Sequence, residues 1–271
     1  MKIIEPKDYK AGVEKTLACQ ISSRGQSFQY EEALVVEHTM EIYINDTLTY
    51  EVVCSPTDLK ALVLGRLLSD GVIHDPGQVK MLYLCEAGLR AKVFLEHWVP
   101  PKASLGVEQV ASCCTGNRTI ADLFRNSQEP AKIIPIAYER AWIFRLAEAM
   151  KENMPLYAAT HGTHSCLLMH RGEILRRAED IGRHNALDKV LGWALLAGVP
   201  LEECILYTSG RIPVDMVMKV IRAGVPILAS KAMPTRESVL LAERFGLTIV
   251  GAARTDSMVL FQPEASGLDN V

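Results

Sequence analysis

Two adjacent cysteines, Cys113 and Cys114, are the side chains of this sequence best suited to nucleophilic chemistry. They follow Ser112 in a polar stretch without an apolar run to bury them, and Arg118 lies close by in the sequence. Exposure and thiolate character make a cysteine reactive, so either thiol could carry a persulfide, form a thioester or exchange disulfides. A disulfide between neighbours is strained. Two small loop residues without a chemical role are the other interpretation, and both stay open.

The densest group of polar side chains lies between residues 176 and 189. Seven of these fourteen residues are Arg, Lys, Glu or Asp, and a glycine, a histidine and an asparagine stand where a strand should give way to a helix. A charged run usually forms a solvated face, but this composition also suits a binding turn. His184 could act in acid–base chemistry or orient a ligand, or it could only cap the helix.

Polar stretches also follow three short apolar runs in the last third of the chain. These runs alternate with two helical stretches, which predicts a βαβαβ unit with parallel strands. Ligands bind beyond the carboxyl ends of such strands, and helix N-termini at this edge suit an anion. Arg211, Lys231 and Arg254 add positive charge there, so we expect a phosphate-bearing ligand such as a nucleotide. The apolar runs are residues 204–207, 227–229 and 247–250. The helical stretches between them are residues 213–222 and 235–245. The polar stretches are residues 208–211, 230–232 and 252–256.

Familiar phosphate and metal motifs are absent from the sequence. It contains neither a P-loop nor a G-x-G-x-x-G turn opening a helix, so the nucleotide prediction does not rest on a motif. His161 and His164 lie in a turn before an apolar run, but no C-x-x-C, no H-x-x-x-H and no zinc-deaminase signature accompanies them. We therefore expect no protein-bound catalytic metal.

The first third of the chain is expected to be β-rich with one helix. Apolar and polar residues alternate on both sides of Asn45-Asp46, which predicts a half-buried hairpin. The segment Ser-Pro-Thr-Asp from residue 55 predicts a helix start, with Ser55 accepting from the first N–H groups, and Gly71 suits the helix end. The remaining expected elements are strands over 79–84 and 91–95, a loop over 112–128, and helices over 137–153 and 186–195.

Composition excludes several classes of protein. The chain has 271 residues, of which 49% are hydrophobic and 23% charged, so a sizeable core can form. A net charge of −3 argues against general binding to nucleic acid or anionic membranes. The chain has no run of 18 apolar residues and its N-terminus has no apolar signal-peptide core, so a cytoplasmic protein is expected. Seven scattered cysteines indicate reduced thiols.

Five segments resemble the signature motifs of one family, and the likeness covers most of residues 35–262. They read RRAEDIGRHNALDKVLGWALLAG from residue 176, THGTHSC from 160, TSGRIPVDMVMKVIRAGVPILASKAMPT from 208, GLTIVGAARTDSM from 246 and CSPTDLKALVLGRLLSDGVI from 54. The first of these is the most specific. All are similar to motifs of the FdhD family, the formate dehydrogenase accessory sulfurtransferases.

The resemblance implies a mixed α+β and α/β fold. It places a cytidine-deaminase-like α/β/α domain with parallel strands, but without the zinc, over residues 135–271. A smaller β-rich domain with one helix would occupy residues 1–110, and a mobile cysteine loop would link the two over residues 111–134.

The resemblance also implies a function. Members of the family act as sulfur carriers that pass persulfide sulfur from a cysteine desulfurase to the molybdenum or tungsten bis-guanine-dinucleotide cofactor, which formate dehydrogenase requires. They are dimers that bind the guanine-nucleotide portions of this cofactor, so a GDP-like nucleotide should bind, and the formate dehydrogenase catalytic subunit would be a partner. Neither nucleic acid nor a membrane is expected as a partner.

Family loops typically read S-C-G-x-C-G, whereas this loop reads Ser112-Cys113-Cys114-Thr115-Gly116. Matching Ser-Cys to Ser-Cys makes Cys113 the expected persulfide carrier, with Cys114 as a substitute or a relay. The residues expected to bind the cofactor are Arg183, His184, Asn185, Asp188, Ser209, Gly210, Arg211, Ser230, Ala252, Ala253, Arg254, Thr255, Asp256 and Ser257. The alternatives are a cofactor chaperone without covalent sulfur transfer, and a cysteine hydrolase pairing Cys113 with His161, His164 or His184.

Overall fold

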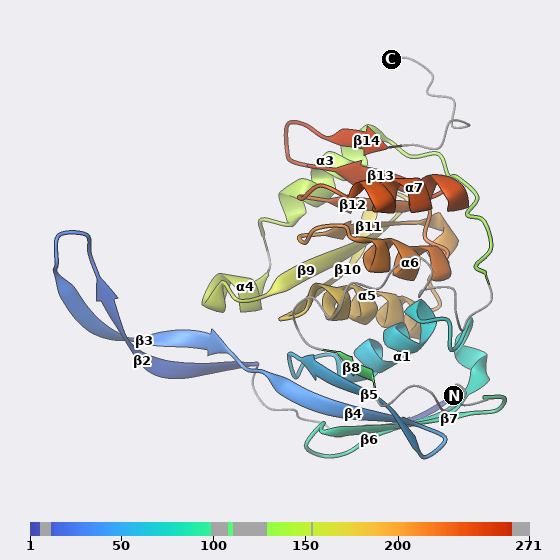
Figure 1. Cartoon of the computed structure of the whole chain (residues 1–271), viewed down its shortest axis with the longest axis horizontal. Helices are drawn as coiled ribbons and strands as arrows, with labels where there is room; N and C mark the ends of the chain where they lie inside the picture. Colours follow the sequence, from blue (N-terminus) through green and yellow to red (C-terminus); the bar gives the residue numbers. More distant parts are fainter. Residues whose placement is uncertain (6–11, 99–107, 111–128, 153, 262–271) are drawn as a thin grey trace.

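The computed structural model describes residues 1–5, 12–98, 108–110, 129–152 and 154–261. Within these ranges the strands form two larger sheets and a separate two-stranded arm (Figure 1). The first sheet has the order β1-β6-β7-β4-β5-β8, and the second has the order β10-β9-β11-β12-β13-β14. The strands of the first sheet are β1 (Lys2–Ile4), β4 (His38–Ile44), β5 (Thr47–Cys54), β6 (Val79–Leu84), β7 (Arg90–Leu95) and β8 (Glu108–Val110).

The first sheet confirms the predicted hairpin. Strands β4 and β5 pair antiparallel, and the two residues between them, Asn45 and Asp46, have φ angles of 45° and 62°. Positive φ at both central positions is typical of the tight turns that match the twist of a hairpin. Buried and more exposed residues alternate along β4, as expected of a sheet with one face on the core. The predicted strands β6 and β7 are also present and pair with each other.

Helix α1 (Leu59–Ser69) forms where a helix was predicted, but its N-terminus differs from the prediction. The N-cap residue is Asp58, in a left-handed conformation, and no side chain caps the helix. The expected capping role of Ser55 is wrong. Its hydroxyl accepts a hydrogen bond from the Ile181 N–H (3.1 Å) and its own N–H donates to Asp180 (3.0 Å), so it joins β5 to the end of β10 instead. Gly71 follows the helix with φ 75°, as predicted.

The second sheet confirms the predicted βαβαβ unit. Strand β11 (Cys204–Thr208) pairs parallel with β12 (Ile227–Ser230), which pairs parallel with β13 (Thr248–Gly251). Thr235 caps α7 by accepting from the Ser238 N–H. Helix α5 (Arg183–Ala197) precedes β11. Helix α6 (Val214–Arg222) links β11 to β12, and α7 (Arg236–Phe245) links β12 to β13. The flanking strands β9 (His164–His170), β10 (Glu173–Asp180) and β14 (Val259–Phe261) run antiparallel to their neighbours, and short 3-10 turns lie at Pro76–Gln78 and Leu201–Glu203.

The helix predicted over 137–153 is shorter than expected. The structure has α3 (Arg140–Ala149) and then a separate short helix, α4 (Pro155–Thr160), because a proline suits a first turn and Pro155 opens a new helix. Leu146 of α3 packs in a cluster with alternate residues of β9, β11 and β12. Helices α5, α6 and α7 pack with the other face of the same strands. The second sheet is therefore covered by helices on both faces.

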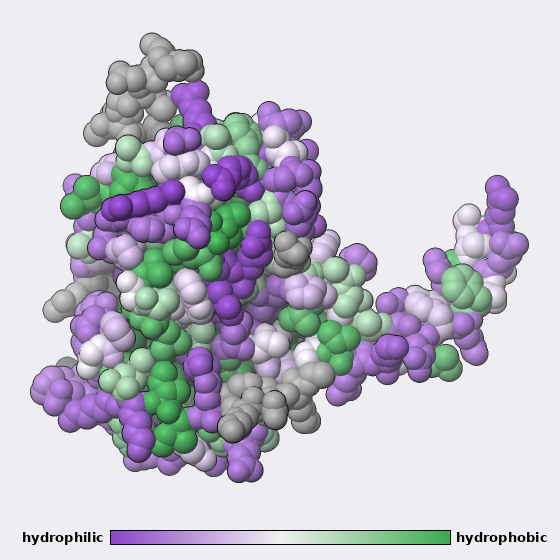
Figure 2. Space-filling view, turned by 180° about the vertical axis from the view of Figure 1, so that it is seen from behind, coloured by the Kyte–Doolittle hydropathy of each residue, from purple (hydrophilic) through white to green (hydrophobic). Residues whose placement is uncertain are grey.

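The arm consists of β2 (Val13–Ile21) and β3 (Ser27–Val35), and sequence analysis did not anticipate it. It extends away from the body in both views (Figures 1 and 2). Figure 2 shows mainly hydrophilic surface along it, broken by apolar patches. The exposed apolar side chains on the arm are Leu17, Ile21, Phe28 and Leu34.

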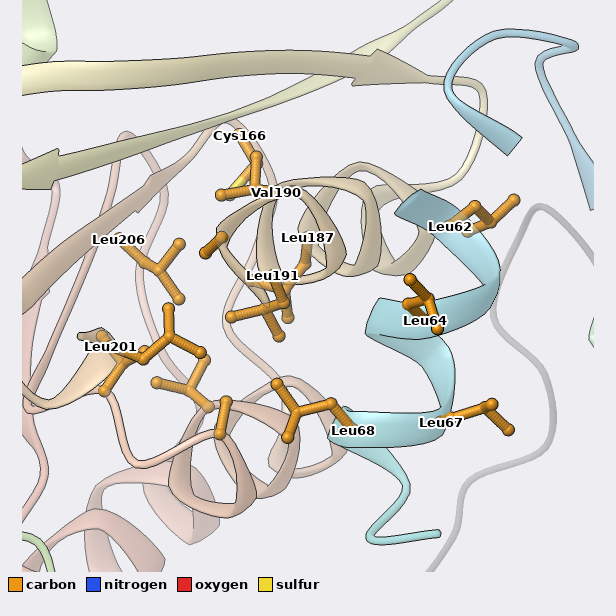
Figure 3. Close-up of a cluster of buried hydrophobic side chains, with 14 of the residues drawn as sticks. Leu62, Leu64, Leu67, Leu68, Cys166, Leu187, Val190, Leu191, Leu201 and Leu206 are labelled. Atoms are coloured by element: carbon orange, nitrogen blue, oxygen red, sulfur yellow. The ribbon is translucent and has the colours of Figure 1, made fainter. Parts of the chain in front are cut away.

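Helix α1 packs between the first sheet and helix α5 of the second (Figure 1). Nearly all of its residues are buried, and Figure 3 shows its leucines pointing both toward α5 and away from it. Gly65 of α1 and Gly192 of α5 lie at the crossing: a Cβ at Gly65 would come within 1.7 Å of the Asp188 carbonyl oxygen, and one at Gly192 within 1.8 Å of the Ala61 carbonyl oxygen. Two glycines thus allow the helix backbones to touch. The boundaries predicted for separate domains stay a prediction.

Candidate functional site

The strand ends that the sequence singled out meet at one edge of the second sheet. Thr208 at the end of β11 is in register with Ser230 at the end of β12 and with Cys166 near the start of β9. Asp180, at the end of β10, is in register with His164. The turn into α5, the His164 turn and the loops after β11, β12 and β13 therefore share this edge, which we call the strand edge.

Gly210 allows three of the predicted residues to come together. A Cβ there would lie 3.2 Å from Cβ of Arg183 and 3.6 Å from Nδ1 of His164, so a larger side chain would crowd both. The hydroxyl oxygen of Ser209 accepts from the Ser165 N–H (3.0 Å) and lies 3.3 Å from Nδ1 of His164. Arg183, His164 and Ser209 thus form one polar corner at the strand edge.

Ser230 fixes the backbone of the neighbouring loops. It is fully buried, donates to the Gly210 carbonyl (2.6 Å) and accepts from the Ala232 N–H (3.0 Å). Its own carbonyl accepts from the Ala253 N–H (2.8 Å). Ala252 adopts a φ of 44°, a conformation that costs a residue with a Cβ free energy. Ser230 and Ala253, both expected to bind the cofactor, are therefore buried residues whose hydrogen bonds hold the backbone of these loops in place.

Exposed cations lie on these loops as predicted: Arg211, Lys231 and Arg254 are all exposed. Thr255, Asp256 and Ser257 are exposed next to Arg254, whose N–H donates to the Ser257 carbonyl (2.8 Å). Sequence reasoning missed a further cation, Lys151, whose ammonium donates to the Thr255 hydroxyl (3.3 Å). Nothing in the sequence around Lys151, just after α3, indicates this contact. The strand edge therefore offers positive charge to an anionic ligand.

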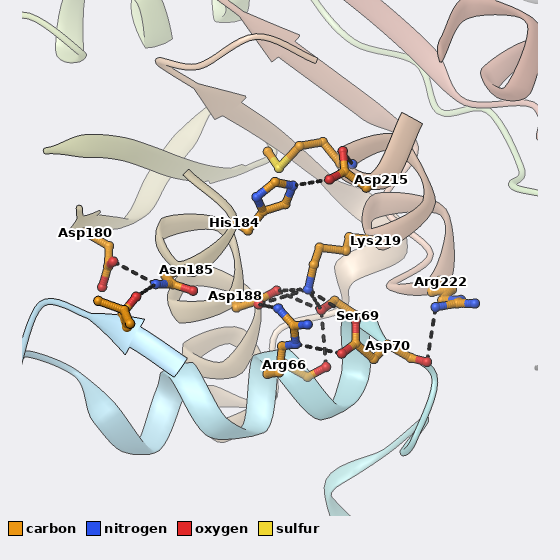
Figure 4. Close-up of polar contacts among 12 residues, drawn as sticks. Arg66, Ser69, Asp70, Asp180, His184, Asn185, Asp188, Asp215, Lys219 and Arg222 are labelled. Carbon is orange, nitrogen blue, oxygen red and sulfur yellow. Dashed lines mark hydrogen bonds and ion pairs between the residues drawn. The ribbon is translucent and has the colours of Figure 1, made fainter. Parts of the chain in front are cut away.

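Asn185 and Asp188 lie apart from this exposed surface, in buried contacts of α5 (Figure 4). The Asn185 amide donates to Asp180 (2.9 Å) and to the Val53 carbonyl (2.8 Å). Both carboxylate oxygens of Asp188 accept from the Lys219 ammonium, at 3.0 and 2.9 Å. In this placement the two residues order the helix that carries Arg183 and His184, and they do not line the exposed loops.

Lys189 is a structural residue that sequence reasoning did not single out. It is fully buried, and its ammonium contacts the Asp180 carboxylate (2.7 Å), the Thr57 hydroxyl (3.0 Å) and the carbonyls of Ser55 and Glu179. A lysine inside a charged run predicts a solvated side chain, so only the fold reveals this role. It ties the turn before α1 to the end of β10.

His184 and Asp215 form an ion pair beside the polar corner, with 2.8 Å between Nε2 and Oδ2. Burial by itself raises the pKa of Asp215, but the hydrogen bond and charge of His184 outweigh it and lower this pKa to about 2. For His164, burial and then the charges of Arg183 and His184 lower the pKa below its usual value. His164 is therefore favoured in its neutral form at the strand edge.

Replacing Asp215 by asparagine should lower the free energy of unfolding by about 1 kcal/mol at pH 7, a value reduced because the side chain is one-third exposed. The pKa is lower in the folded than in the unfolded chain, so this contribution is present above pH 3.8 and is lost as the pH falls toward 2. Urea unfolding of both proteins between pH 2 and 7 measures it. Asp256→Asn, at an exposed carboxylate, is the control, and a difference that persists unchanged at pH 2 would contradict the assignment.

Cys113 and Cys114 lie outside the described residues, as does the rest of the loop predicted over 112–128. The backbone of β8 is described up to Val110, which pairs with Val52 of β5. The pairing of Cys113 with His161, His164 or His184, which a hydrolase would need, stays a prediction. Within the described ranges, no group of three His, Cys, Asp or Glu residues could hold a metal ion, and no helix is long and apolar enough to cross a membrane.

Comparison with known proteins gives consistent matches over most of the chain. A model of the FdhD/NarQ family matches residues 35–266. A sulfur carrier protein FdhD from Listeria innocua is 31% identical over 243 residues, covering 86% of this chain and 90% of the relative. One from Bacillus pumilus is 33% identical over 238 residues, covering 88% and 91%.

A solved structure shares the fold. The crystal structure of a candidate formate dehydrogenase accessory protein from Desulfotalea psychrophila matches with a TM-score of 0.76 and 26% identity, covering 94% of this chain and 98% of that one. The family match spans the turn before α1, the His164 turn, the polar corner and the loops of the strand edge. The chain belongs to the FdhD/NarQ family.

Proposed function

We propose that this protein is a sulfur carrier for formate dehydrogenase. In this proposal Cys113 accepts sulfane sulfur from a cysteine desulfurase: its thiolate attacks the terminal sulfur of the desulfurase persulfide, forms a persulfide on Cys113 and releases the desulfurase thiol. The outer sulfur then passes to the metal of a molybdenum or tungsten bis-guanine-dinucleotide cofactor, which is the substrate of the protein. In this step the S–S bond breaks, the Cys113 thiolate leaves, and the reduced metal would supply the two electrons that convert the sulfane sulfur to a sulfide ligand. The names of the relatives, sulfur carrier and formate dehydrogenase accessory protein, support this class of activity.

The position of β8 is the observation that carries the proposal. Val110 pairs with Val52, and the carbonyl of the next residue, Val53, accepts from Asn185 in the first turn of α5. Cys113 follows Val110 by three residues, so covalent geometry keeps their Cα atoms within about 11 Å of each other. In the proposal the Cys113 thiol acts at the turn that carries Arg183 and His184.

The strand edge supports binding of the nucleotide portions of the cofactor. Phosphate groups carry negative charge, and Arg211, Lys231 and Arg254 are exposed on adjacent loops. In the proposal these cations and the polar corner hold a GDP-like group, while Ser230 and Asp188 keep the loops and α5 in place. The proposal includes a cytidine-deaminase-like arrangement of the second sheet, a homodimer, a cytoplasmic location and contact with the formate dehydrogenase catalytic subunit.

The persulfide step makes a direct prediction. After incubation with an active cysteine desulfurase and cysteine without reductant, intact-mass spectrometry should show that the protein gains one sulfur atom, and that reductant removes it. Cys113→Ala should lose this gain almost completely, because the acceptor thiol is gone. Cys114→Ala should keep most of it, and this matched variant controls for changes in the loop.

Other outcomes would separate the alternatives. Loss in Cys114→Ala only would make Cys114 the carrier. A wild-type protein that gains no sulfur, while the desulfurase is active, would overturn sulfur transfer and favour a cofactor chaperone. The same conclusion would follow if the double variant Cys113→Ala with Cys114→Ala still activated formate dehydrogenase as well as wild type does.

A further inference from the structure

A cavity of about 330 Å³ lies between the turn before α1, the start of α4 and strand β10. Its walls come from residues 57–58, 154–156 and 177–179. None of the residues assigned to the strand edge lines it, so it is a separate feature of the molecule. Its volume is at the lower end of the range of small-molecule sites, which run from about 300 to 1,000 Å³.

One wall of this cavity carries a positively charged side chain, that of Arg177. Nε of Arg177 is buried and has no hydrogen-bond acceptor among the described residues. Nε of the adjacent Arg176 also has no acceptor among the described residues, but Nη2 of that guanidinium pairs with Asp58 at 2.5 Å. A buried N–H of a charged group without an acceptor costs free energy, and such groups in folded proteins generally meet an acceptor from a ligand or water.

The nearby carboxylate does not neutralise Arg177. Glu179 turns its two oxygens to the start of α4, where they accept from the backbone N–H groups of Leu156 (3.0 Å) and Tyr157 (2.7 Å). The Thr163 hydroxyl donates to the same carboxylate (3.3 Å). These bonds occupy Glu179 and also remove the first N–H groups of α4 from contact with a ligand. Arg177 is therefore the cation among the described lining residues that can bind an anion.

We propose that this cavity binds a small organic monocarboxylate with a short aliphatic chain. The carboxylate would pair with the Arg177 guanidinium, whose planar set of N–H groups matches two oxygens. The aliphatic part would lie against the apolar walls formed by Met154, Pro155 and Leu156. A phosphate dianion fits less well, because Glu179 adds negative charge and no second uncommitted cation is found among the described lining residues.

The methyl group of Met154 provides the reporter for a test on the full chain. The probe is isovalerate, and the matched neutral probe is isovaleramide, which has the same shape but no charge. Protein carrying ¹³C-methyl methionine is titrated with each probe by NMR, and the Met154→Leu variant assigns the Met154 signal among the ten methionines. Isovalerate should shift this signal saturably, with an affinity in the millimolar range, and the amide should bind at least about ten-fold more weakly.

Two variants test the role of the guanidinium. Arg177→Met should weaken isovalerate binding by about ten-fold or more, whereas Arg177→Lys keeps the charge and should lose less. Arg211→Met removes an exposed cation of the strand edge and should leave binding unchanged. The proposal is overturned if isovalerate causes no saturable shift, if the amide binds equally well, or if Arg177→Met binds like wild type. The amide comparison uses the unaltered protein, so it decides the question even if Arg177→Met does not fold.

Discussion

Replacing Gly192 by alanine is expected to lower the free energy of unfolding by about 3 kcal/mol or more. The added Cβ would lie 1.8 Å from the Ala61 carbonyl oxygen and 2.6 Å from the Gly65 backbone nitrogen, both on α1. Backbone atoms cannot rotate away as a side chain can, so α1 and α5 would have to separate. Alanine favours a helix by only about 1 kcal/mol over glycine, which does not offset this cost.

Chemical denaturation of wild type and Gly192→Ala measures the effect. Gly224→Ala is the matched control. Apart from the two chain neighbours, no atom of the described residues lies within 4 Å of a Cβ at Gly224, so the strain there comes from its positive φ of 73°. We expect the control to lose about 1 kcal/mol. If both variants lost the same free energy of unfolding, the backbones of α1 and α5 would not be in contact at Gly192.

The second large effect is expected at Lys189. Replacing it by methionine should lower the free energy of unfolding by about 3–5 kcal/mol, because the Asp180 carboxylate would stay buried without its counter-ion. Asp180 and Lys189 are both fully buried and lie 2.7 Å apart. The substitution also leaves the carbonyls of Ser55 and Glu179 without the ammonium that donates to them.

Two comparisons make this test specific. Lys80→Met removes an ion pair with Glu96 in which both side chains are more than half exposed, and it should cost less than about 1 kcal/mol. The double variant Lys189→Met with Asp180→Asn removes the uncompensated charge, so it should be more stable than Lys189→Met alone. If the double variant were the less stable of the two, burial of an unpaired charge would not be the cause.

The sequence predicted the second sheet well because its elements are locally determined. Each of β11, β12 and β13 is a short apolar run, and each of α6 and α7 carries its own apolar stripe and a glycine just after it. The shared edge of the loops after β11, β12 and β13 also followed from topology, since the ends of parallel strands lie at one edge of a sheet. The approach of His164 and Arg183 to Ser209 was not predicted. The hairpin at Asn45 was predicted for the same reason, because its turn chemistry lies within a few residues.

The predictions that failed depend on contacts between distant parts of the chain. Ser55 has the sequence context of a helix cap, yet its bonds go to residues more than 120 positions away. The partners of Asn185 and Asp188 could not be predicted for the same reason: Asn185 binds Val53 and Asp180, and Asp188 binds Ser69 and Lys219, all on other elements. Their expected role at the cofactor stays a prediction. The arm was missed because its strands mix polar and apolar residues, without the regular alternation that a strand packed on a core shows.

The packing of α1 against α5 also bears on how the chain folds during synthesis. The apolar residues of α1, including Leu64 and Leu68, leave the ribosome about 120 residues before α5, the helix they cover. At about 5–20 residues per second, the nascent chain would expose this helix for roughly 6–24 s before its partner is made. We expect chaperones that bind apolar segments to contact residues 59–69 during that interval.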